Sequence, residues 1–375
     1  MSGYFAFLLS LLILPLGKCV KRRRLLWSDY ARIAAAYYLT MITDEVVSPA
    51  TDYPTMCVIF FIVICWLDCL EDLQQHRAPY CLLCVMGVYA ITLKLTAGLI
   101  LILLIKPAVM LIREKKVKEI IIYLLSGLVV AVPWMIRTFL ISGYLFYPLA
   151  ALDLFDVEWK MSAENISVDV AQIKTWGRGL YNSSLVNLPV KEWFPNWFLT
   201  TLSRTEQFLI LADVMSIFLI LGGFLVLLWK RAWSHLDELL VMAAVGVSYL
   251  YWQLSAPLLR YGYAYVLLLC MLTAGWILLR LHFDRILLGC ILIIGCYKAY
   301  MQVDYIWSIK AYPYYIFQQE YGSYEVEERL LGDQIVYVPA TGDQTGYAYF
   351  PSIPVLTYDF EMRGDSFQDG FRRID

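Results

Sequence analysis

Long apolar stretches separated by short charged segments dominate this sequence and leave it few ways to fold. The hydrophobic share of 60% exceeds the usual share of a soluble globular domain. Several stretches approach the roughly 20 residues that a helix needs to cross a bilayer. We therefore predict an all-α polytopic membrane protein with about nine or ten transmembrane helices. The predicted helices cover residues 4–17, 25–43, 54–71, 80–94, 95–112, 119–140, 207–228, 238–256, 261–280 and 284–300.

Basic residues gather in alternate loops of this arrangement and set its orientation. Because cytoplasmic loops carry the excess of Lys and Arg, the basic loops are placed on the inner side. The short loops on the outer side contain only Lys94 and Arg260. The chain is thus predicted to cross a membrane several times with its C-terminus extracytoplasmic. The inner loops contain Lys18, Lys21, Arg22, Arg23, Arg24, Arg77, Arg113, Lys115, Lys116, Lys118, Lys230, Arg231, Arg280 and Arg285.

Two long polar segments fall on the outer side. Residues 141–206 link two predicted helices and are rich in aromatic residues, which argues against disorder. Because Trp favours the membrane interface, this loop is predicted to lie on the outer surface as short helices. Residues 301–375 contain a strand pattern at 334–339 and a turn at Gly342–Asp343. They are predicted to form a small α+β tail after a transmembrane domain of residues 1–300.

Two parts of the helical layout stay open. Segment 25–43 is interrupted by Asp29 and Arg32, so it can form a transmembrane helix or an amphipathic helix on the surface. That choice affects only the side of the first loop. Residues 80–112 can form one bent helix or a hairpin, and a hairpin places Lys94 at its tip on the outer side.

Several classes of function lack their signatures in the sequence. Cys81 and Cys84 match a CxxC spacing, but they lie in an apolar run without a nearby His, so packing is favoured over metal or redox chemistry. The histidines His76, His235 and His282 all fall on the inner side, which argues against an outer zinc or His-dependent site. Basic patches with interleaved aromatics are absent, so we predict no nucleic-acid partner. Nucleotide-binding fingerprints are absent too, which argues against the use of energy from a cytosolic nucleotide.

Carboxylates gather between the helices predicted at 25–43 and 54–71. Asp44 and Glu45 end the first helix, and Asp52 precedes the second in a tight loop bounded by prolines. Asp52 or Asp44 could take a proton from a hydroxyl group. Asp44 and Glu45 could hold a divalent cation such as Mg²⁺ or Mn²⁺. The alternative is a solvated loop in which Asp52 favours the start of the next helix.

Three isolated bases occupy the outer side, which is otherwise poor in bases. Lys94 and Arg260 lie in short outer loops, and Arg137 lies at the outer end of the helix predicted at 119–140. Each could be an interface anchor that extends its charged end to water. Together they would suit an anionic ligand, most naturally a phosphate or diphosphate at headgroup level. A charge at membrane depth costs about 2.5–3.5 kcal/mol, which favours a functional reason for it.

One segment resembles a known family. Arg137–Pro148 reads RTFLISGYLFYP and is similar to the R-N-x-x-x-x-G-x-P-x-Y-P type segment of bacterial proteins in the GT-C glycosyltransferase superfamily. Thr138 stands where the motif has Asn, and Leu145 stands where it has its first Pro. The segments Ser48–Pro54 and Asp153–Lys160 resemble motifs of an uncharacterised branch that is common in Bacteroidetes.

The resemblance covers residues 44–375 and implies a protein of the bacterial inner membrane that transfers sugar from a polyprenyl-phosphate carrier at the outer face of that membrane. Members of the superfamily use an acidic residue of the first outer loop and bases that bind the lipid phosphate. Asp52 and Arg137 match motif positions, whereas Lys94 and Arg260 are assigned by topology alone. The acceptor loop would then contain Asp156, Glu158, Trp159 and Lys160.

The leading hypothesis is a GT-C-like glycosyltransferase that moves a sugar from a polyprenyl-phosphate donor to a surface glycan or lipid acceptor. Asp52 or Asp44 would deprotonate the acceptor hydroxyl. Lys94, Arg137 and Arg260 would neutralise the leaving lipid phosphate, and stabilising such charge is often the largest catalytic effect. A divalent cation is an optional addition, since three bases could serve.

Two other hypotheses stay open. A flippase or transporter of lipid-linked oligosaccharides would need charged groups at mid-membrane depth, and the helix centres are nearly free of them apart from Asp213. A non-catalytic assembly partner, or a truncated enzyme, would fit the missing acidic motif, for which the chain has no room before Asp44. A first predicted helix that enters from the outer side suggests a truncated chain or a fragment of a longer protein. An assembly partner would depend on the Trp-rich region 190–200.

Overall fold

The chain folds into two compact units. The first comprises residues 1–131 and 171–317, and the second comprises residues 132–170 and 318–375. Helix is the main secondary structure, at 74%, and a small antiparallel sheet lies near the C-terminus, in agreement with the predicted fold class. The computed structural model describes residues 2–22, 24–48, 50–71, 77–230, 235–281, 284–308, 310, 317, 324–342, 348–354 and 360–374.

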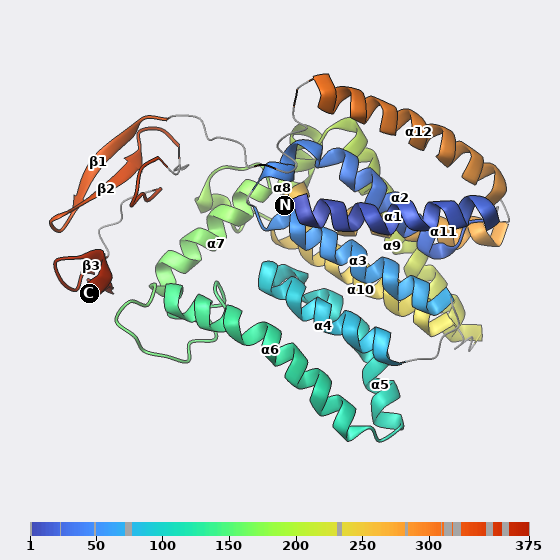
Figure 1. Ribbon diagram of the computed structural model, residues 1–375, viewed down its shortest axis with the longest axis horizontal. Coiled ribbons are helices and arrows are strands. Elements are labelled where there is room, and N and C mark those ends of the chain that lie inside the picture. Colours follow the sequence, from blue (N-terminus) through green and yellow to red (C-terminus); the bar gives the residue numbers. More distant parts are fainter. Residues whose placement is uncertain are drawn as a thin grey trace. The chain divides into compact units, whose positions relative to one another are not determined.

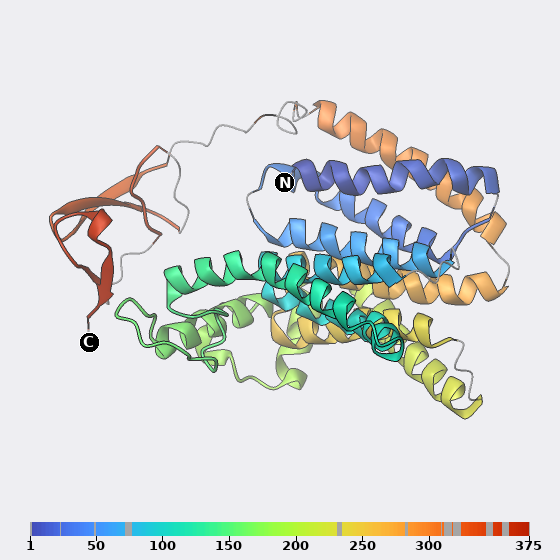
Figure 2. The same ribbon diagram turned by 60° about the horizontal axis from the view of Figure 1, so that its bottom comes forward.

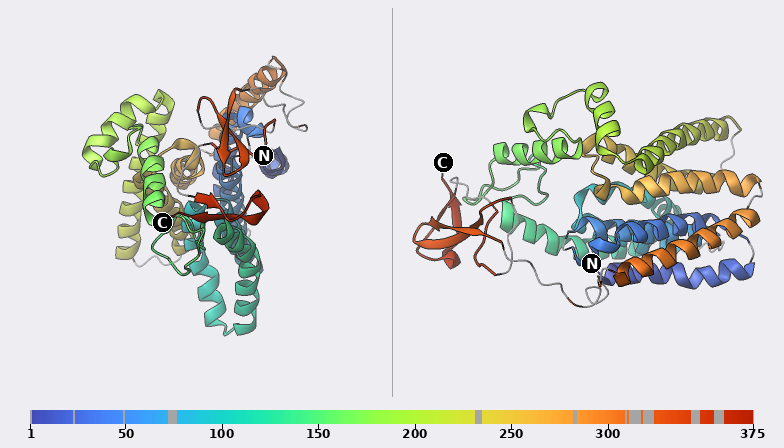
Figure 3. Two further views of the ribbon diagram at one scale, coloured as in Figure 1. Left: turned by 90° about the vertical axis from the view of Figure 1, so that its left-hand side faces the viewer. Right: turned by 90° about the horizontal axis from the view of Figure 1, so that it is seen from above.

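Helices pack side by side in the first unit. Figures 1 and 2 show α1, α2 and α3 lying next to one another, and Figure 3 shows that their axes run in similar directions to those of α10 and α11. The described helices are α1 (Ser2–Arg22), α2 (Trp27–Met41), η1 (Thr43–Val47), α3 (Asp52–Glu71), α4 (Arg77–Leu93), η2 (Leu95–Leu104), α5 (Ile105–Arg113), α6 (Val117–Ser142), α7 (Ala163–Gly177), η3 (Ser183–Leu185), α8 (Val190–Asn196), η4 (Trp197–Thr201), α9 (Arg204–Lys230), α10 (Leu236–Ser255), η6 (Leu259–Tyr261), α11 (Tyr263–Leu281) and α12 (Asp284–Ser308).

Five helices in the described part of the chain are long and apolar enough to cross a membrane. They are fewer than the nine or ten predicted. Two of the other predicted spans are short helices, α2 with 15 residues and α4 with 17. The five are Asp52–Glu71, Leu95–Arg113, Val117–Ser142, Arg204–Lys230 and Tyr263–Leu281. They are consistent with a multi-pass membrane protein.

The surface of the long helices also suits lipid. None of the most apolar window of α6 is buried in the protein, and only 17% of that of α9 is. Large apolar side chains such as Val129, Phe208 and Leu225 are exposed there. A soluble protein rarely exposes continuous apolar faces of this size, whereas lipid tails cover them in a membrane.

The segment predicted at 25–43 packs inside the bundle as α2 and does not lie flat on its surface. One face of α2 is buried against α3 and α11. Its two charged residues pair with each other, since Arg32 Nη1 lies 3.1 Å from Asp29 Oδ1. Arg32 also pairs with Asp68 of α3, so both charges are compensated within the bundle.

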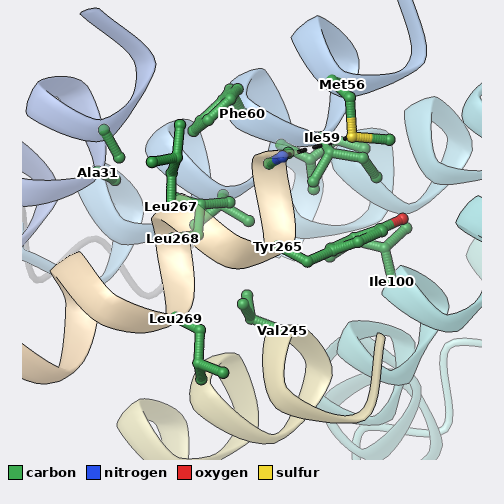
Figure 4. Close-up of a cluster of buried hydrophobic side chains, with 14 of the residues drawn as sticks. Ala31, Met56, Ile59, Phe60, Ile100, Val245, Tyr265, Leu267, Leu268 and Leu269 are labelled. Carbon is green, nitrogen blue, oxygen red and sulfur yellow. Dashed lines mark hydrogen bonds between the residues drawn. The ribbon is translucent and has the colours of Figure 1, made fainter. Parts of the chain in front are cut away.

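The centre of this bundle is apolar. Met56, Ile59 and Phe60 of α3 meet Leu267 and Leu268 of α11 in Figure 4. Burying side chains of this size contributes roughly 1.5–3 kcal/mol each. The core therefore fixes how α3 and α11 lie against each other, and so where the residues at their ends are held.

Residues 80–112 form the hairpin that was one of the two predicted possibilities. Helix α4 ends at Leu93, Lys94 adopts an extended backbone (φ −154°, ψ 119°), and η2 then runs back along α4. The two helices approach closely because Gly87 faces Leu101, whose Cδ2 would lie 2.6 Å from an added Cβ. Lys94 is therefore at the tip of the hairpin.

The second unit contains two β-hairpins. Strand β1 (Val326–Leu331) pairs antiparallel with β2 (Gln334–Pro339), and β3 (Phe360–Met362) pairs with β4 (Phe371–Arg373). The strand predicted at 334–339 is confirmed as β2. Gly332, with φ +60°, supplies the left-handed conformation in the two-residue turn between β1 and β2. Of the predicted turn, Gly342 is described, whereas Asp343 lies outside the described residues.

The contact between α2 and α11 gives a test of the bundle. A Cβ added to Gly275 of α11 would lie 2.6 Å from Cγ of the Tyr30 ring on α2, so we expect Gly275→Ala to destabilise the protein by about 1–3 kcal/mol through overpacking. Gly246→Ala is the matched control, because its nearest neighbour would lie 3.9 Å away. Thermal unfolding in detergent should show a lower midpoint for the first variant only. An unchanged midpoint for Gly275→Ala would contradict this packing.

Candidate functional site

Three of the predicted site residues meet at one end of the first unit. The Asp52 carboxylate pairs with the Lys94 amine, and its Oδ2 lies 3.4 Å from Nε of Arg260. These residues are 42 and more positions apart in the sequence, so only the fold brings them together. The Asp52 and Lys94 side chains are 11% and 17% exposed, whereas that of Arg260 is 49% exposed. Arg260 is therefore the member of the group most accessible to a ligand.

Each of the three residues lies at a break in regular structure. Asp52 is the first residue of α3, where the partial positive charge of a helix N-terminus favours a carboxylate. Lys94 occupies the tip of the α4–η2 hairpin. Arg260 lies in η6, the single turn between α10 and α11. Helix ends leave side chains free to converge, which explains why the site forms here and not along a helix.

Tyr261 completes the group and was missed by the sequence analysis. The Lys94 amine lies 3.0 Å from the centroid of the Tyr261 ring, a cation–π contact. Nη2 of Arg260 lies 3.3 Å from the Tyr261 hydroxyl oxygen. Its position next to Arg260 in the sequence was the only available signal.

Side-chain donors hold the loop that carries Arg260. Nη2 of Arg178 donates to the carbonyl of Leu254 at 3.2 Å. Nε1 of Trp197 donates to the carbonyl of Pro257 at 3.1 Å. A third donor, Nε1 of Trp252, bonds the next carbonyl along the loop at 2.9 Å. Three such bonds restrict the backbone just before Arg260 and so limit where its guanidinium can go.

Two tryptophans of the Trp-rich region are interior support, whereas other residues of the region, such as Val190 and Leu199, are exposed. Trp193 and Trp197 are 1% and 0% exposed, and the Arg178 guanidinium stacks on the Trp193 ring at 4.7 Å. Substitutions at 190–200 would disturb the loop that carries Arg260 as well as any partner contact. They cannot distinguish an enzyme from an assembly partner, contrary to our expectation from the sequence.

The other predicted acids lie close to the group in sequence but make different contacts. Asp44 and Glu45 are both exposed in η1. The Tyr305 hydroxyl of α12 donates to Oδ2 of Asp44 at 3.0 Å, and the Tyr53 hydroxyl is hydrogen-bonded to Glu45. In the described part of the chain, no group of three or more His, Cys, Asp or Glu residues is arranged to hold a metal ion. The divalent cation at Asp44 and Glu45 stays a prediction.

The remaining predicted residues belong to the second unit. Arg137 is exposed on α6. Oε1 of Glu158 lies 2.7 Å from Nη2 of Arg363, whose guanidinium also lies 5.4 Å from the Trp159 ring. Lys160 pairs with the predicted loop's own Asp153, while Asp156 is exposed. Glu158 and Trp159 thus hold the C-terminal tail, a contact that the sequence analysis did not foresee.

The electrostatic balance of the first group is positive. Two cations face one carboxylate, so one positive charge is left over while Lys94 is protonated. Burial lowers the pKa of Lys94 from 10.5 to about 8, and the neighbouring Asp52 offsets only part of that effect. The net charge of this group therefore changes around the pKa of Lys94, about 8, a pH at which arginine stays protonated.

Comparison with known proteins places the chain in a family. A family model described as a domain of unknown function (DUF8201) matches residues 1–267. The chain belongs to the DUF8201 family. Asp52, Lys94, Tyr261 and Arg260 all lie within the part that matches DUF8201, whereas the two β-hairpins lie outside it. The comparisons with curated proteins and with solved structures found no match.

The low pKa of Lys94 predicts how anion binding depends on pH. If the group binds a lipid phosphate, as the sequence analysis expects, affinity for a polyprenyl monophosphate in detergent should fall several-fold as pH rises through about 8, because Lys94 loses its proton while the phosphate stays doubly charged above its second pKa near 6. Lys94→Arg should show no such fall, since arginine stays protonated. Fluorescence titration with a labelled lipid at several pH values measures both. A wild-type affinity that does not change with pH would contradict the role of Lys94 in binding the anion.

Proposed function

We propose that this chain is a GT-C-like glycosyltransferase that uses a polyprenyl-phosphate-linked sugar as donor and a surface glycan or lipid as acceptor. The observation that carries the proposal is the convergence of Lys94 and Arg260 on one carboxylate at the ends of membrane-type helices. Two cations at the ends of these helices suit a phosphate attached to a lipid whose chain lies in the bilayer. The choice of reaction rests on the resemblance of Arg137–Pro148 and Ser48–Pro54 to GT-C segments.

The reaction would be a substitution at the anomeric carbon of the sugar. The acceptor oxygen forms a bond to that carbon while the bond between the carbon and the lipid-phosphate oxygen breaks. The bonding pair leaves with the lipid phosphate, and Lys94 and Arg260 neutralise its charge. The acceptor proton passes to a carboxylate, for which we assign Asp52 and keep Asp44 as the alternative.

Asp52 can accept a proton only after its two cations have found another anion. Both of its oxygens face a cation in the free protein, Oδ1 towards Lys94 and Oδ2 towards Arg260. Protonating Asp52 there would leave two buried or half-buried cations without a counter-charge, which is unfavourable. A bound phosphate would supply that counter-charge. The donor therefore binds before the acceptor is activated, and in its absence Asp52 is inert.

A pair of matched arginine variants tests the proposal. We expect Arg260→Gln to lower transfer about 10²- to 10³-fold, the usual effect of removing one group that stabilises developing charge. Arg280→Gln is the control: Arg280 also lies 3.3 Å from a carboxylate oxygen and stacks on an aromatic ring, but it does so with Glu238 and Trp276. Transfer is measured in nanodiscs with polyprenyl-phosphate-linked radiolabelled hexoses and extracted envelope lipids.

The outcomes separate the hypotheses. Loss of transfer in Arg260→Gln and Asp52→Asn, with membrane insertion and the Arg280→Gln control intact, supports the enzyme. Binding of polyprenyl monophosphate that depends on Arg260, without transfer of any hexose, would favour an assembly partner or a carrier of lipid-linked sugars. Equal activity of Arg260→Gln and Arg280→Gln would refute a role for the Asp52 site.

A further inference from the structure

The carboxyl group of Asp213, inside the first unit, has no positively charged partner among the described residues. Asp213 lies on α9, is 0% exposed, and neither of its carboxyl oxygens has a hydrogen-bond partner of normal geometry among the described residues, although the backbone N–H of Cys270 is close enough to interact with it. It is nine residues from the start of α9 at Arg204, which places it about 14 Å along the helix axis. That depth is close to the middle of a hydrocarbon core about 30 Å thick. An ionisable group at such depth points to a function.

The neighbours of Asp213 come from α10 and α11, the helices that pack against α9. Tyr249 of α10 and Cys270 of α11 are close enough to interact electrostatically with its carboxyl group. Figure 4 shows the α10–α11 contact at this level, where Val245 faces Leu269, the residue before Cys270. None of these side chains carries a positive charge. The nearest acid on the same face of α9 is Glu206, two turns away, which accepts from the Tyr263 hydroxyl at 3.3 Å.

Two more buried polar groups continue from Asp213 along α10. The Tyr249 hydroxyl and both amide atoms of Gln253 lack hydrogen-bond partners among the described residues, although these side chains are only 1% and 7% exposed. Residues four apart on a helix lie above one another, so Tyr249 and Gln253 share a face of α10. Gln253 is in the last turn of α10, just before the loop that carries Arg260. Buried polar atoms without partners are rare and call for an explanation.

A bound cation explains these groups together. An ionised carboxylate without a hydrogen bond is too costly to bury in an apolar interior, so a carboxyl group there takes up a counter-ion or a proton. Hard metal ions need about six oxygen ligands. Besides the Asp213 carboxyl, the side-chain oxygens identified in this row are the Tyr249 hydroxyl and the Gln253 carbonyl, too few for such a shell. A proton needs only one oxygen, and hydroxyl and amide groups can relay it.

We propose that Asp213 binds a proton, and that this proton exchanges with the end of the bundle near Arg260 along Tyr249 and Gln253. The site does not depend on the proposed sugar transfer. It gives the bundle a neutral acid that donates to whichever acceptor approaches it, and it links the packing of α9, α10 and α11 to the proton concentration at one end of the bundle.

Infrared spectroscopy of the purified full chain in nanodiscs tests the proposal. A protonated carboxylic acid has a carbonyl band distinct from that of a carboxylate. We expect this band in the wild type at neutral pH, its loss in Asp213→Asn, and its displacement but retention in Asp213→Glu. Asp304→Asn is the matched control, because Asp304 is exposed on α12, and it should leave the band unchanged.

Transfer to D₂O measures the path. The band should shift to lower frequency as deuterium replaces the proton, and Tyr249→Phe or Gln253→Leu should slow the shift about tenfold, which corresponds to a barrier about 1.4 kcal/mol higher. A wild type without the band, together with a thermal midpoint that rises in sodium relative to choline salt, would overturn the proposal in favour of a metal cation. An exchange rate equal in wild type and both α10 variants would overturn the path.

Discussion

The ion pairs of Asp52 with Lys94 and Arg260 organise one end of this bundle. Without Asp52, a lysine and an arginine at the ends of separate apolar helices would repel each other and leave their loops unrestrained. With it, the start of α3, the tip of the α4–η2 hairpin and the turn before α11 are held together. Removing one partner of such a pair typically costs about 3–5 kcal/mol when the other charge stays buried. The site is thus structural in the free protein.

Residues outside these ion pairs also restrict the position of Arg260. Trp197 and Trp252 donate to carbonyls in the loop before Arg260, and Arg178 donates to the carbonyl of Leu254 in the last turn of α10. A flexible loop would let Arg260 follow Asp52 or turn to solvent. A loop fixed by two tryptophan donors, with Arg178 bonded to the end of the helix before it, holds the guanidinium half-exposed, where it touches Asp52 with one edge and leaves the rest for an anion. The aromatic segment before α9 therefore contributes to the site through the loop that carries Arg260.

Much of this arrangement could be predicted from the sequence, and the limits have physical causes. Apolar length and charge placement were enough to locate most helices and the strand at 334–339, because these are local properties, whereas they left a hairpin and one bent helix both open for residues 80–112. That Asp52 meets Lys94 and Arg260 depended on long-range packing, and topology gave only the shared side. Tyr261 was missed because an aromatic residue in a helical turn has no distinct pattern. For segment 25–43 the sequence left a transmembrane helix and a surface helix both open. Helix α2 has 15 residues, and its two charged residues are paired inside the bundle.

The two buried acids of the first unit differ in how their charge is compensated, and this difference separates their roles. Asp52 lies at a helix end, where two cations reach its carboxyl group. Asp213 lies about 14 Å inside α9, where no described cation reaches it, so only a proton can compensate it without rebuilding the core. A bundle with only the first acid would suit a transferase at the membrane surface. A proton bound at Asp213 also couples the interior of the bundle to that surface. It gives the transport hypothesis an ionisable group at mid-membrane depth, and the scarcity of such groups had counted against that hypothesis.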